Sequence, residues 1–419
     1  MENRTGLFSN GVIWFGVAIS VSEIEAGIQL ASSAPIDSIW LPLVLGHIIG
    51  GILLFFTGLV GARLRVNAME TIKSTFGDYG SKFFSSLNVM QLIAWVAVLN
   101  AQGAAAMMGL NLPISFTLTC IILSAIIAIW VYVGLYRLSK VTTVMMVVLT
   151  VLLAILSFKL LGGNISNALP IASFASTNST PLNFWNIFEI SIAMPISWLP
   201  VISDYTKDVE KPINGTMISA VAYTIASLWM YILGMQIVGI GTTSIAQSIL
   251  IAGLGAQGVI ILVLSTVTSN FVAANSAGES SKAIVNRINP RIAGVVVSIL
   301  SCILAISGIM DHYIGFLYLI ASVFAPMAAV LLVSFFISKE DTGNTKIWYW
   351  NMFAWFAGFI VYQVTVGLDS IPLGPTLLAI MVSAALAYAK SVNVPGDIEE
   401  ANLYNYVYNH LKYNCKCEN

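Results

Sequence analysis

The chain has 419 residues, of which 58% are hydrophobic and 9% are charged, and its formal net charge is −1. Soluble domains carry about 25% charged residues, so this composition excludes a water-soluble enzyme and a disordered chain. It also excludes a nucleic-acid binder, which needs a basic surface. The apolar runs are long and continuous, whereas the strands of an outer-membrane barrel alternate over only about 10 residues. The composition therefore predicts an all-α polytopic membrane protein.

Twelve apolar segments are long enough to cross a bilayer, which takes about 20 residues. Two shorter segments, 67–78 and 243–253, are predicted as helices that lie at the membrane interface. The predicted spans are residues 10–33, 38–62, 82–109, 113–134, 138–161, 183–204, 213–240, 256–279, 291–308, 311–337, 347–367 and 371–390.

The basic residues indicate the orientation of these spans. With the N-terminus inside, all of the 18 Lys and Arg residues except Lys159 fall on the cytoplasmic side, as the positive-inside rule requires. We therefore expect a multi-pass protein of the plasma (inner) membrane with both termini cytoplasmic. The expected units are a cytoplasmic N-terminus (1–9), a first inverted repeat (10–161), a second inverted repeat (183–337), two additional spans (347–390) and a cytoplasmic tail (391–419).

The first and sixth spans contain residues that interrupt a membrane helix. Glu23 and Glu25 lie in the middle of the first span, where a charge costs at least about 2.5 kcal/mol unless it is paired or faces a cavity. Pro195 and Pro200 each remove a backbone hydrogen bond from the sixth span. A proline kink without a functional role is the alternative for each break. Interruptions at matching positions of an inverted repeat favour the central site of a secondary transporter.

The eighth span carries hydroxyl groups on one face, because Ser265, Thr268 and Ser269 are spaced i, i+3 and i+4. Such hydroxyls often bond back to their own helix. Alternatively, they and the carbonyls of an unwound helix supply the neutral hard oxygens that a small alkali cation uses. No Lys or Arg lies in the middle of a span to replace a cation. This pattern favours sodium over a purely proton-driven site.

The third span places Gln91 and Trp95 one helical turn apart. An aromatic plate beside an amide suits a flat heteroaromatic ligand, because the ring supplies stacking area and the amide reads the ligand edge. The alternative is a tryptophan at the membrane interface, but Trp95 lies in the middle of its span.

Short motifs follow one another in a specific order along residues 8 to 390. They are Trp14-Phe15-Gly16, Ser22-Glu23-Ile24, Gly46-His47, Ala68-Met69-Glu70, Phe76-Gly77, Asn88-Val89-Met90-Gln91-Leu92 with Trp95, Met194-Pro195-Ile196-Ser197-Trp198-Leu199-Pro200, Asp204-Tyr205-Thr206, and Leu317-Tyr318-Leu319-Ile320 with Pro326. Together they resemble the nucleobase–cation symporter-1 family, and within it the hydroxymethylpyrimidine permease subgroup, close to the cytosine permeases.

The resemblance implies a leucine-transporter-like fold, with a 5+5 inverted repeat plus two helices, that imports nucleobase-like rings with a cation, usually sodium. It implies a sodium site made of the backbone oxygens of Gly16 and Ile19, the carbonyl of Ser265 and the hydroxyls of Thr268 and Ser269. It also implies a substrate site made of Trp95, Met194 and Pro195, with Ser197 and Trp198 nearby and Ser265 or Thr266 on the eighth span.

The chain departs from the cytosine permeases, which carry asparagine in this part of the eighth span. It departs again at Ser334-Phe335-Phe336, where an acidic element is common. We infer that Glu23 supplies the contact with the ligand edge that the missing asparagine would make. A carboxyl group can accept an amino hydrogen and meet a ring nitrogen of an aminopyrimidine. A structural acid, salt-bridged or protonated, is the alternative. Ser20 and Gln91 complete the expected substrate site, and His47 is expected to pack or to bond between helices.

The sequence thus predicts a secondary active importer of a small pyrimidine, either 4-amino-5-hydroxymethyl-2-methylpyrimidine-like or cytosine-like, coupled to sodium by alternating access. We expect a monomer as the functional unit within the lipid bilayer, no cofactor beyond the sodium ion and no nucleic-acid partner. The alternatives are a proton-coupled carrier of the same fold for another nucleobase, a hydantoin or an amino acid, and a non-transporting membrane sensor. No metalloprotease or serine-hydrolase motif supports a membrane enzyme.

Overall fold

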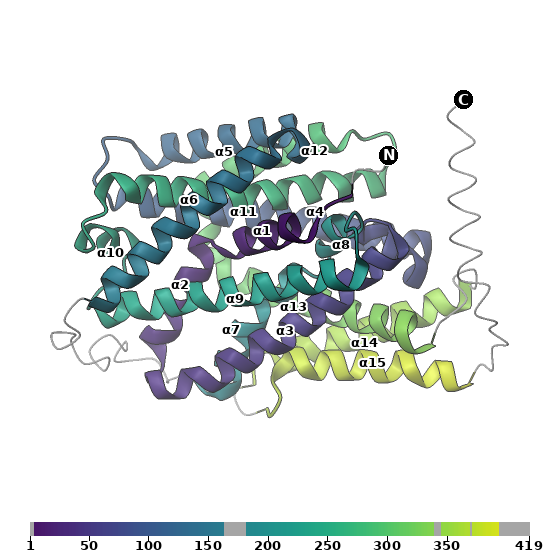
Figure 1. Cartoon of the computed structure of the whole chain (residues 1–419). Coiled ribbons are helices and arrows are strands. Elements are labelled where there is room, and N and C mark those ends of the chain that lie inside the picture. Colours follow the sequence, from purple (N-terminus) through teal and green to yellow (C-terminus); the bar gives the residue numbers. More distant parts are fainter. Residues whose placement is uncertain (1–3, 163–181, 339–344, 369–370, 394–419) are drawn as a thin grey trace.

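The computed structural model describes residues 4–162, 182–338, 345–368 and 371–393, and these parts of the chain are helical almost throughout (Figure 1). Each of the twelve predicted spans coincides with one helix or with helices in series. The first repeat holds α1 (Leu7–Ala18), α2 (Val21–Ser33), α3 (Ile36–Leu64), α4 (Ala68–Met108), α5 (Phe116–Val133) and α6 (Leu135–Gly162).

The second repeat follows the same plan, and two helices come after it. The second repeat holds α7 (Phe184–Ser197), α8 (Ile202–Thr206), α9 (Pro212–Gly239), α10 (Ile245–Ile251), α11 (Gly255–Ile284), α12 (Pro290–Ile306) and α13 (Tyr313–Leu332), which ends in a π-helical turn (Val333–Ser338). The two additional helices are α14 (Thr345–Thr365) and α15 (Gly374–Asn393).

Within the described residues, seven helices are individually long and apolar enough to cross a membrane, and the bent pair α1–α2 makes up to eight. The α12 and α15 helices are apolar but shorter. The structure is therefore that of a multi-pass helical membrane protein, and the total of twelve spans remains a prediction. The expected tail, 391–419, lies almost entirely outside the described residues.

The break in the first span comes from its local sequence. Ser20 has an extended backbone, and its hydroxyl caps α2 by accepting a hydrogen bond from the Glu23 backbone N–H at 3.3 Å. The two halves are inclined by 49°. The sixth span is also interrupted, because α7 ends at Ser197 and α8 begins at Ile202, although no side chain caps α8. Both interruptions predicted from the sequence are therefore real breaks between helices.

The two short helices predicted from the sequence are also present. The segment 243–253 contains α10. The segment 67–78 forms the first turns of α4, up to a kink at Gly77, where φ is +72°. A glycine adopts this left-handed backbone without steric cost. The third span therefore continues from the short helix after a bend.

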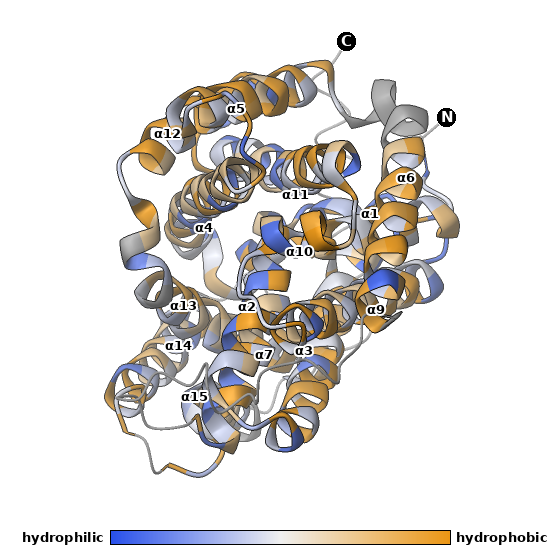
Figure 2. Cartoon of the chain, turned by 90° about the vertical axis from the view of Figure 1, so that its left-hand side faces the viewer, coloured by the Kyte–Doolittle hydropathy of each residue, from blue (hydrophilic) through white to orange (hydrophobic). Residues whose placement is uncertain are grey.

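Helices of the first repeat pack against helices of the second. The α4 helix lies along α11, α3 lies along α7, and α1 and α2 lie along α9. Viewed end-on, α2 lies near the centre of the bundle, and hydrophobic residues dominate the outer helices α5, α6 and α12 (Figure 2). Many polar residues are buried inside the bundle, because the exterior faces lipid. The centre of the bundle is thus the place where the polar chemistry gathers.

Candidate functional site

A small cavity lies at the break between α1 and α2. Its volume is about 10 Å³, which is room for about one water molecule. A pyrimidine ring is larger, so it enters only when the lining side chains move. The lining residues are Val17, Ser20, Ser22, Glu23, Trp95, Leu99, Met194, Trp198 and Ser269. The structure thus brings Ser20, Glu23, Trp95, Met194 and Trp198 of the predicted substrate site to one place.

Aromatic rings form two walls of this cavity. Trp95 packs edge-on against Phe316 of α13, with ring centroids 5.4 Å apart, and against Tyr313 at 6.3 Å. Trp198 packs edge-on against Trp14 at 6.0 Å. The indole Nε1 of Trp95 is buried and has no hydrogen-bond partner among the described residues. A ligand that enters beside Trp95 meets an aromatic wall and a free donor.

Gln91 lies one turn along α4 from Trp95 and crosses to the broken sixth span. Its amide nitrogen donates to the Asn88 side-chain oxygen at 2.8 Å and to the Ser197 backbone oxygen at 3.3 Å. Its Oε1 is buried without a partner among the described residues. Gln91 therefore ties the third span to the break in the sixth span and retains one free acceptor.

Five of the predicted substrate residues do not line the cavity. Gln91 and Ser265 bond to the backbone of neighbouring helices, and the other three pack around the cavity. The Ser197 hydroxyl donates to the Met194 backbone oxygen at 2.6 Å. Pro195 packs against α3 at Gly50, where an added Cβ would overlap the proline ring. Thr266 packs in the same way against Gly103 of α4. These residues shape the helices around the cavity and do not face it.

Glu23 is the only acidic residue that lines the cavity, and it is 2% exposed. Its Oε1 accepts a 2.9 Å hydrogen bond from the Tyr223 hydroxyl, and its Oε2 lies 2.8 Å from the Ser227 hydroxyl. Both partners lie on α9. No basic side chain bonds to Glu23 in the described part of the chain. The carboxyl is therefore held by neutral hydroxyl groups.

Glu25 and Ser22 bond to other helices, and Ser22 also lines the cavity. The Gln102 amide of α4 donates to the Glu25 carboxylate at 3.1 Å, and the Ser22 and Tyr313 hydroxyls lie 3.1 Å apart. These contacts connect α2 to α4 and α13. The two acids of the first span consequently occupy different environments, and Glu23 alone faces the cavity.

The predicted sodium ligands meet where α1 ends against α11. The Ser265 hydroxyl donates to the Ile19 backbone oxygen at 2.9 Å, and the Ser269 hydroxyl donates to the Val17 backbone oxygen at 3.1 Å. The Thr268 hydroxyl bonds to its own helix, at the Leu264 backbone oxygen, which is the alternative that the sequence left open. Its lone pairs remain available as a ligand.

Gly16 belongs to the same break. The Ser20 backbone N–H donates to the Ala18 oxygen at 2.8 Å, and it therefore does not occupy the Gly16 oxygen as it would in a regular helix. The oxygens around the break are neutral and hard, which is the donor set that an alkali cation takes. The described residues contain no group of His, Cys, Asp and Glu that could hold another metal.

Sequence reasoning missed Tyr223 and Ser227, the two partners of Glu23, and the hydroxyl of Tyr313. Tyr223, Ser227 and Tyr231 are spaced by four residues along α9, so they form a polar stripe in an otherwise apolar span. That spacing is a signal that the sequence contained.

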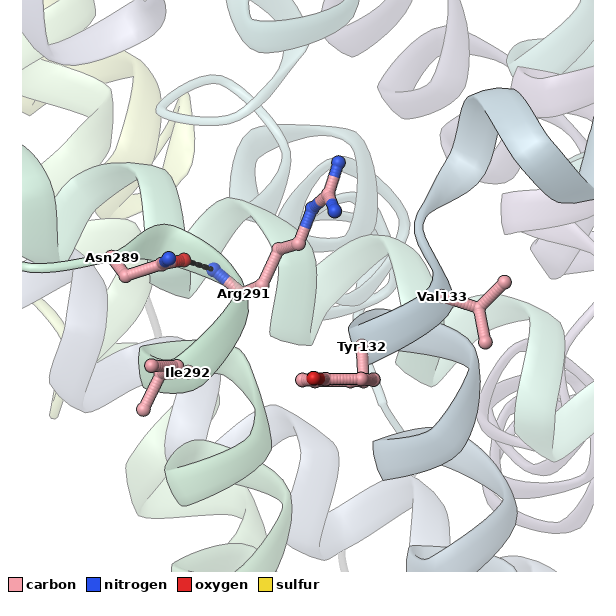
Figure 3. A pocket seen from close by; sticks show the side chains of 5 residues that line it. All are labelled: Tyr132, Val133, Asn289, Arg291 and Ile292. Carbon is pink, nitrogen blue, oxygen red and sulfur yellow. Dashed lines mark hydrogen bonds between the residues drawn. The ribbon is translucent and has the colours of Figure 1, made fainter.

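A larger cavity of about 310 Å³ lies elsewhere, between the end of α5 and the start of α12 (Figure 3). Its lining includes Asn289, whose side chain accepts a 3.0 Å hydrogen bond from the Arg291 backbone N–H and so caps α12. The other lining residues are Tyr132, Val133, Arg291 and Ile292. No residue of either broken helix lines this cavity, so the smaller one is the candidate site.

Two broken helices at matching positions, packed around a buried polar site, define the leucine-transporter-like fold. Solved structures agree with this fold. Mhp1, a nucleobase-cation-symport-1 family transporter with bromovinylhydantoin bound, aligns with a TM-score of 0.70 at 19% identity, over 93% of this chain and 92% of that one. A Na+-coupled sialic acid symporter gives 0.69 at 14% identity, over 94% and 90%. MhsT in complex with L-phenylalanine gives 0.62 at 12% identity, over 94% and 98%.

The sequence profile of a family described as permeases for cytosine/purines, uracil, thiamine and allantoin matches residues 2–357. The chain belongs to this family, and it is a membrane transporter rather than an enzyme. A hydantoin permease of Microbacterium maritypicum is 31% identical over 106 residues. That alignment spans 25% of this chain and 22% of the relative, about a fifth of the length of the curated relative.

Proposed function

We propose that the chain imports a small aminopyrimidine together with sodium, by alternating access, as a monomer in the plasma membrane with both termini cytoplasmic. The observation that carries this proposal is the position of Glu23. Its carboxyl group is buried, bonded only to hydroxyls, and lies in the wall of a cavity that Trp95 and Trp198 also line.

The chemistry of this wall favours a ring with adjacent donor and acceptor groups. With Glu23 protonated, its carbonyl oxygen accepts the hydrogen of an exocyclic amino group, and its O–H donates to the neighbouring ring nitrogen. The indole of Trp95 stacks on the ring face. A 4-amino-5-hydroxymethyl-2-methylpyrimidine-like substrate presents this edge, and cytosine presents a related one.

Sodium is proposed at the junction of α1 and α11. The hydroxyls of Thr268 and Ser269 and the backbone oxygens of Gly16, Ile19 and Ser265 would hold it. Because Ser269 also lines the cavity, an ion there fixes the broken helix beside the substrate. Binding of the ion and binding of the ring would therefore stabilise the same arrangement of α1 and α2.

Transport requires the first, second, sixth and seventh spans to move against the rest of the bundle. Hydrogen bonds now cross that boundary near the sixth span. The Tyr205 hydroxyl donates to the Val272 backbone oxygen at 3.2 Å, and the Asn88 amide donates to the Pro200 backbone oxygen at 3.3 Å. These contacts would break when the cytoplasmic side opens.

Uptake into proteoliposomes tests the proposal. Radiolabelled 4-amino-5-hydroxymethyl-2-methylpyrimidine and cytosine should accumulate when sodium is higher outside, and accumulation should collapse when the sodium gradient is dissipated. A proton gradient without sodium serves as the control. If neither ring is taken up, or if uptake is indifferent to sodium, the proposal is wrong.

A hydantoin is the second candidate substrate, because the segment of 106 residues that matches a hydantoin permease supports it. A hydantoin ring offers N–H donors to Glu23 but lacks the amino group. Competition by pyrimidines, purines and hydantoins distinguishes the candidates. Only the class of ring that the protein transports should inhibit the uptake of the labelled substrate.

A further inference from the structure

Glu25 is the one acid of the first span that neither the proposed substrate site nor the proposed sodium site uses. The Gln102 amide of α4 donates to its Oε2 at 3.1 Å. The hydroxyl of Ser22, one turn before Glu25 on α2, lies 3.1 Å from the Tyr313 hydroxyl of α13. The Tyr313 hydroxyl also interacts with the Gln102 side chain and with the charge of Glu25. The four side chains therefore form one polar cluster that joins α2, α4 and α13.

This cluster is rich in oxygen atoms and poor in positive charge. It holds a carboxylate, an amide carbonyl and two hydroxyls, which are the hard oxygen ligands that hard cations take. Among the described residues, Glu25 has an amide donor as its partner, and no Lys or Arg bonds to it. A carboxylate inside a membrane protein is costly unless it is paired. The cluster therefore has ligands for a cation and a negative charge that lacks a counter-charge.

Gln102 provides a second, independent observation. Its side chain is 1% exposed, and its Oε1 is buried without a hydrogen-bond partner among the described residues. A buried acceptor that is left unpaired is costly. A half-turn of the amide exchanges Oε1 and Nε2 without changing the shape of the side chain, so Oε1 can face the Glu25 carboxylate. Two such oxygens repel each other unless a cation lies between them, and a cation would satisfy both.

The cluster lies directly beside the candidate substrate site. Ser22 belongs both to the cluster and to the wall of the small cavity. Gln102 lies two turns beyond Trp95 on α4, about 10 Å along the helix axis, and Glu25 lies two residues beyond Glu23 on α2. In the predicted orientation this is the outer side of the cavity. Glu25 is partly exposed, which gives an ion a route to its carboxylate.

We propose that Glu25, Gln102, Ser22 and Tyr313 form a second sodium site, separate from the one at the junction of α1 and α11. The cluster has one formal negative charge, which matches a monovalent cation. Sites for Ca²⁺ draw on several carboxylates, and the described residues contain no group of three or more His, Cys, Asp and Glu side chains that could hold a metal ion. This inference goes beyond the proposed function and does not depend on which ring is transported.

An ion in this second site would hold the outer side of the cavity closed. The α2 helix belongs to the first span, which is expected to move, whereas α4 and α13 belong to the rest of the bundle. The ion draws Glu25 and Ser22 of α2 toward Gln102 of α4 and Tyr313 of α13. Its binding therefore favours the closed arrangement, and its release frees α2 to separate from α4 and α13 when the outer side opens.

Binding of radioactive sodium to the full-length protein in detergent tests the second site without any substrate. Scintillation proximity counting, with choline replacing sodium at constant ionic strength, gives the amount bound at each sodium concentration. We expect Glu25→Gln to bind half as much sodium as the wild type at saturation, because one of two sites is lost. The midpoint of thermal unfolding in choline shows whether the variant is folded.

Double variants separate this site from the other one. Tyr313→Phe removes a hydroxyl ligand and should weaken one class of sodium binding about tenfold. It should have no further effect in the Glu25→Gln protein, since both residues hold the same ion. Thr268→Ala should weaken the binding that remains in Glu25→Gln. Glu189→Gln is the matched control, because that buried acid is bonded to Thr376 and should leave sodium binding unchanged.

The second site and the proposed function fail in different ways. If Glu25→Gln binds as much sodium as the wild type, the second site is wrong and the proposed function stands. The same holds if the infrared band of a protonated carboxyl that Glu25→Gln removes persists at saturating sodium. If Glu25→Gln abolishes all sodium binding and Thr268→Ala changes none, the second site stands and the ion site of the proposed function is wrong. If the wild type binds no sodium, both ion sites are wrong, and uptake still decides which ring is transported.

Discussion

The Ser265 hydroxyl of α11 donates a 2.9 Å hydrogen bond to the Ile19 backbone oxygen, at the point where α1 ends. One turn further along α11, Ser269 makes the equivalent bond to Val17 at 3.1 Å. The last carbonyls of a helix lack intrahelical donors, and inside a membrane they need partners. The eighth span supplies those partners, so the break in the first span is fixed against the helix that carries the proposed sodium ligands.

Replacing Thr268 with alanine should raise the sodium concentration needed for half-maximal uptake, because one proposed ligand oxygen is lost. We expect an increase of about tenfold, the effect of about 1.4 kcal/mol in binding free energy. Thr268→Ser should restore the wild-type value, since it keeps the hydroxyl. Ser281→Ala is the control, because that hydroxyl also bonds to its own helix, at Ala277. An unchanged sodium requirement would remove Thr268 from the site.

Replacing Trp95 with alanine should weaken substrate binding, because the ring loses its stacking surface. The dissociation constant, measured by binding of radiolabelled pyrimidine, should rise about tenfold or more, and Trp95→Phe should lose less. Trp355→Phe is a control at a buried tryptophan that packs against Phe83 and Phe84, away from the cavity. Equal affinities in wild type and Trp95→Ala would contradict the stacking role.

Glu189 should stabilise the contact between the sixth span and α15. Its two carboxyl oxygens accept hydrogen bonds from the Thr376 backbone N–H at 3.0 Å and from the Thr376 hydroxyl at 2.6 Å. Glu189→Ala and Thr376→Ala should each lower the midpoint of thermal unfolding in detergent. The double variant should fall short of the sum, since both remove one interaction. Additive losses would show that the two residues act independently.

Gly234 allows α9 to approach α2 closely. A Cβ at this position would overlap the Ile24 backbone oxygen, so Gly234→Ala should push the two helices apart. The separation would disturb the contacts of Glu23 with Tyr223 and Ser227, and we expect a lower unfolding midpoint and reduced uptake. Gly239→Ala, on the same helix, has open space around the added methyl group and should behave as the wild type.

Much of the architecture could be predicted from local sequence. Apolar length located the spans, and Glu23, Glu25, Pro195 and Pro200 marked the two interrupted spans, because each of these effects acts within a few residues. Five of the predicted substrate residues line the cavity for the same reason, since they lie at or beside a break or on a mid-span polar face. The other five, Gln91, Pro195, Ser197, Ser265 and Thr266, do not, because the rotation of a helix about its axis depends on its neighbours. The kink of α4 at Gly77 was found only in the structure.

The partners of Glu23 could not be predicted in this way. Tyr223 and Ser227 are about 200 residues away along the chain, and His47 reaches Glu23 only through Ser227. The polar stripe on α9 could be seen in the sequence, but the helix that it faces could not. Which buried group meets which depends on how α2, α3, α7 and α9 pack against one another.

The sequence by itself determined the class of the molecule, the positions of its helices and the two places where membrane helices break. These follow from the free energy of placing each side chain and each backbone group in lipid, which is a local quantity. Only the tertiary structure decided that Glu23 is held by hydroxyl groups rather than by a cation, and that a histidine lies two hydrogen bonds away. Those relationships arise from packing between segments that are far apart in the sequence, and local sequence does not specify such packing.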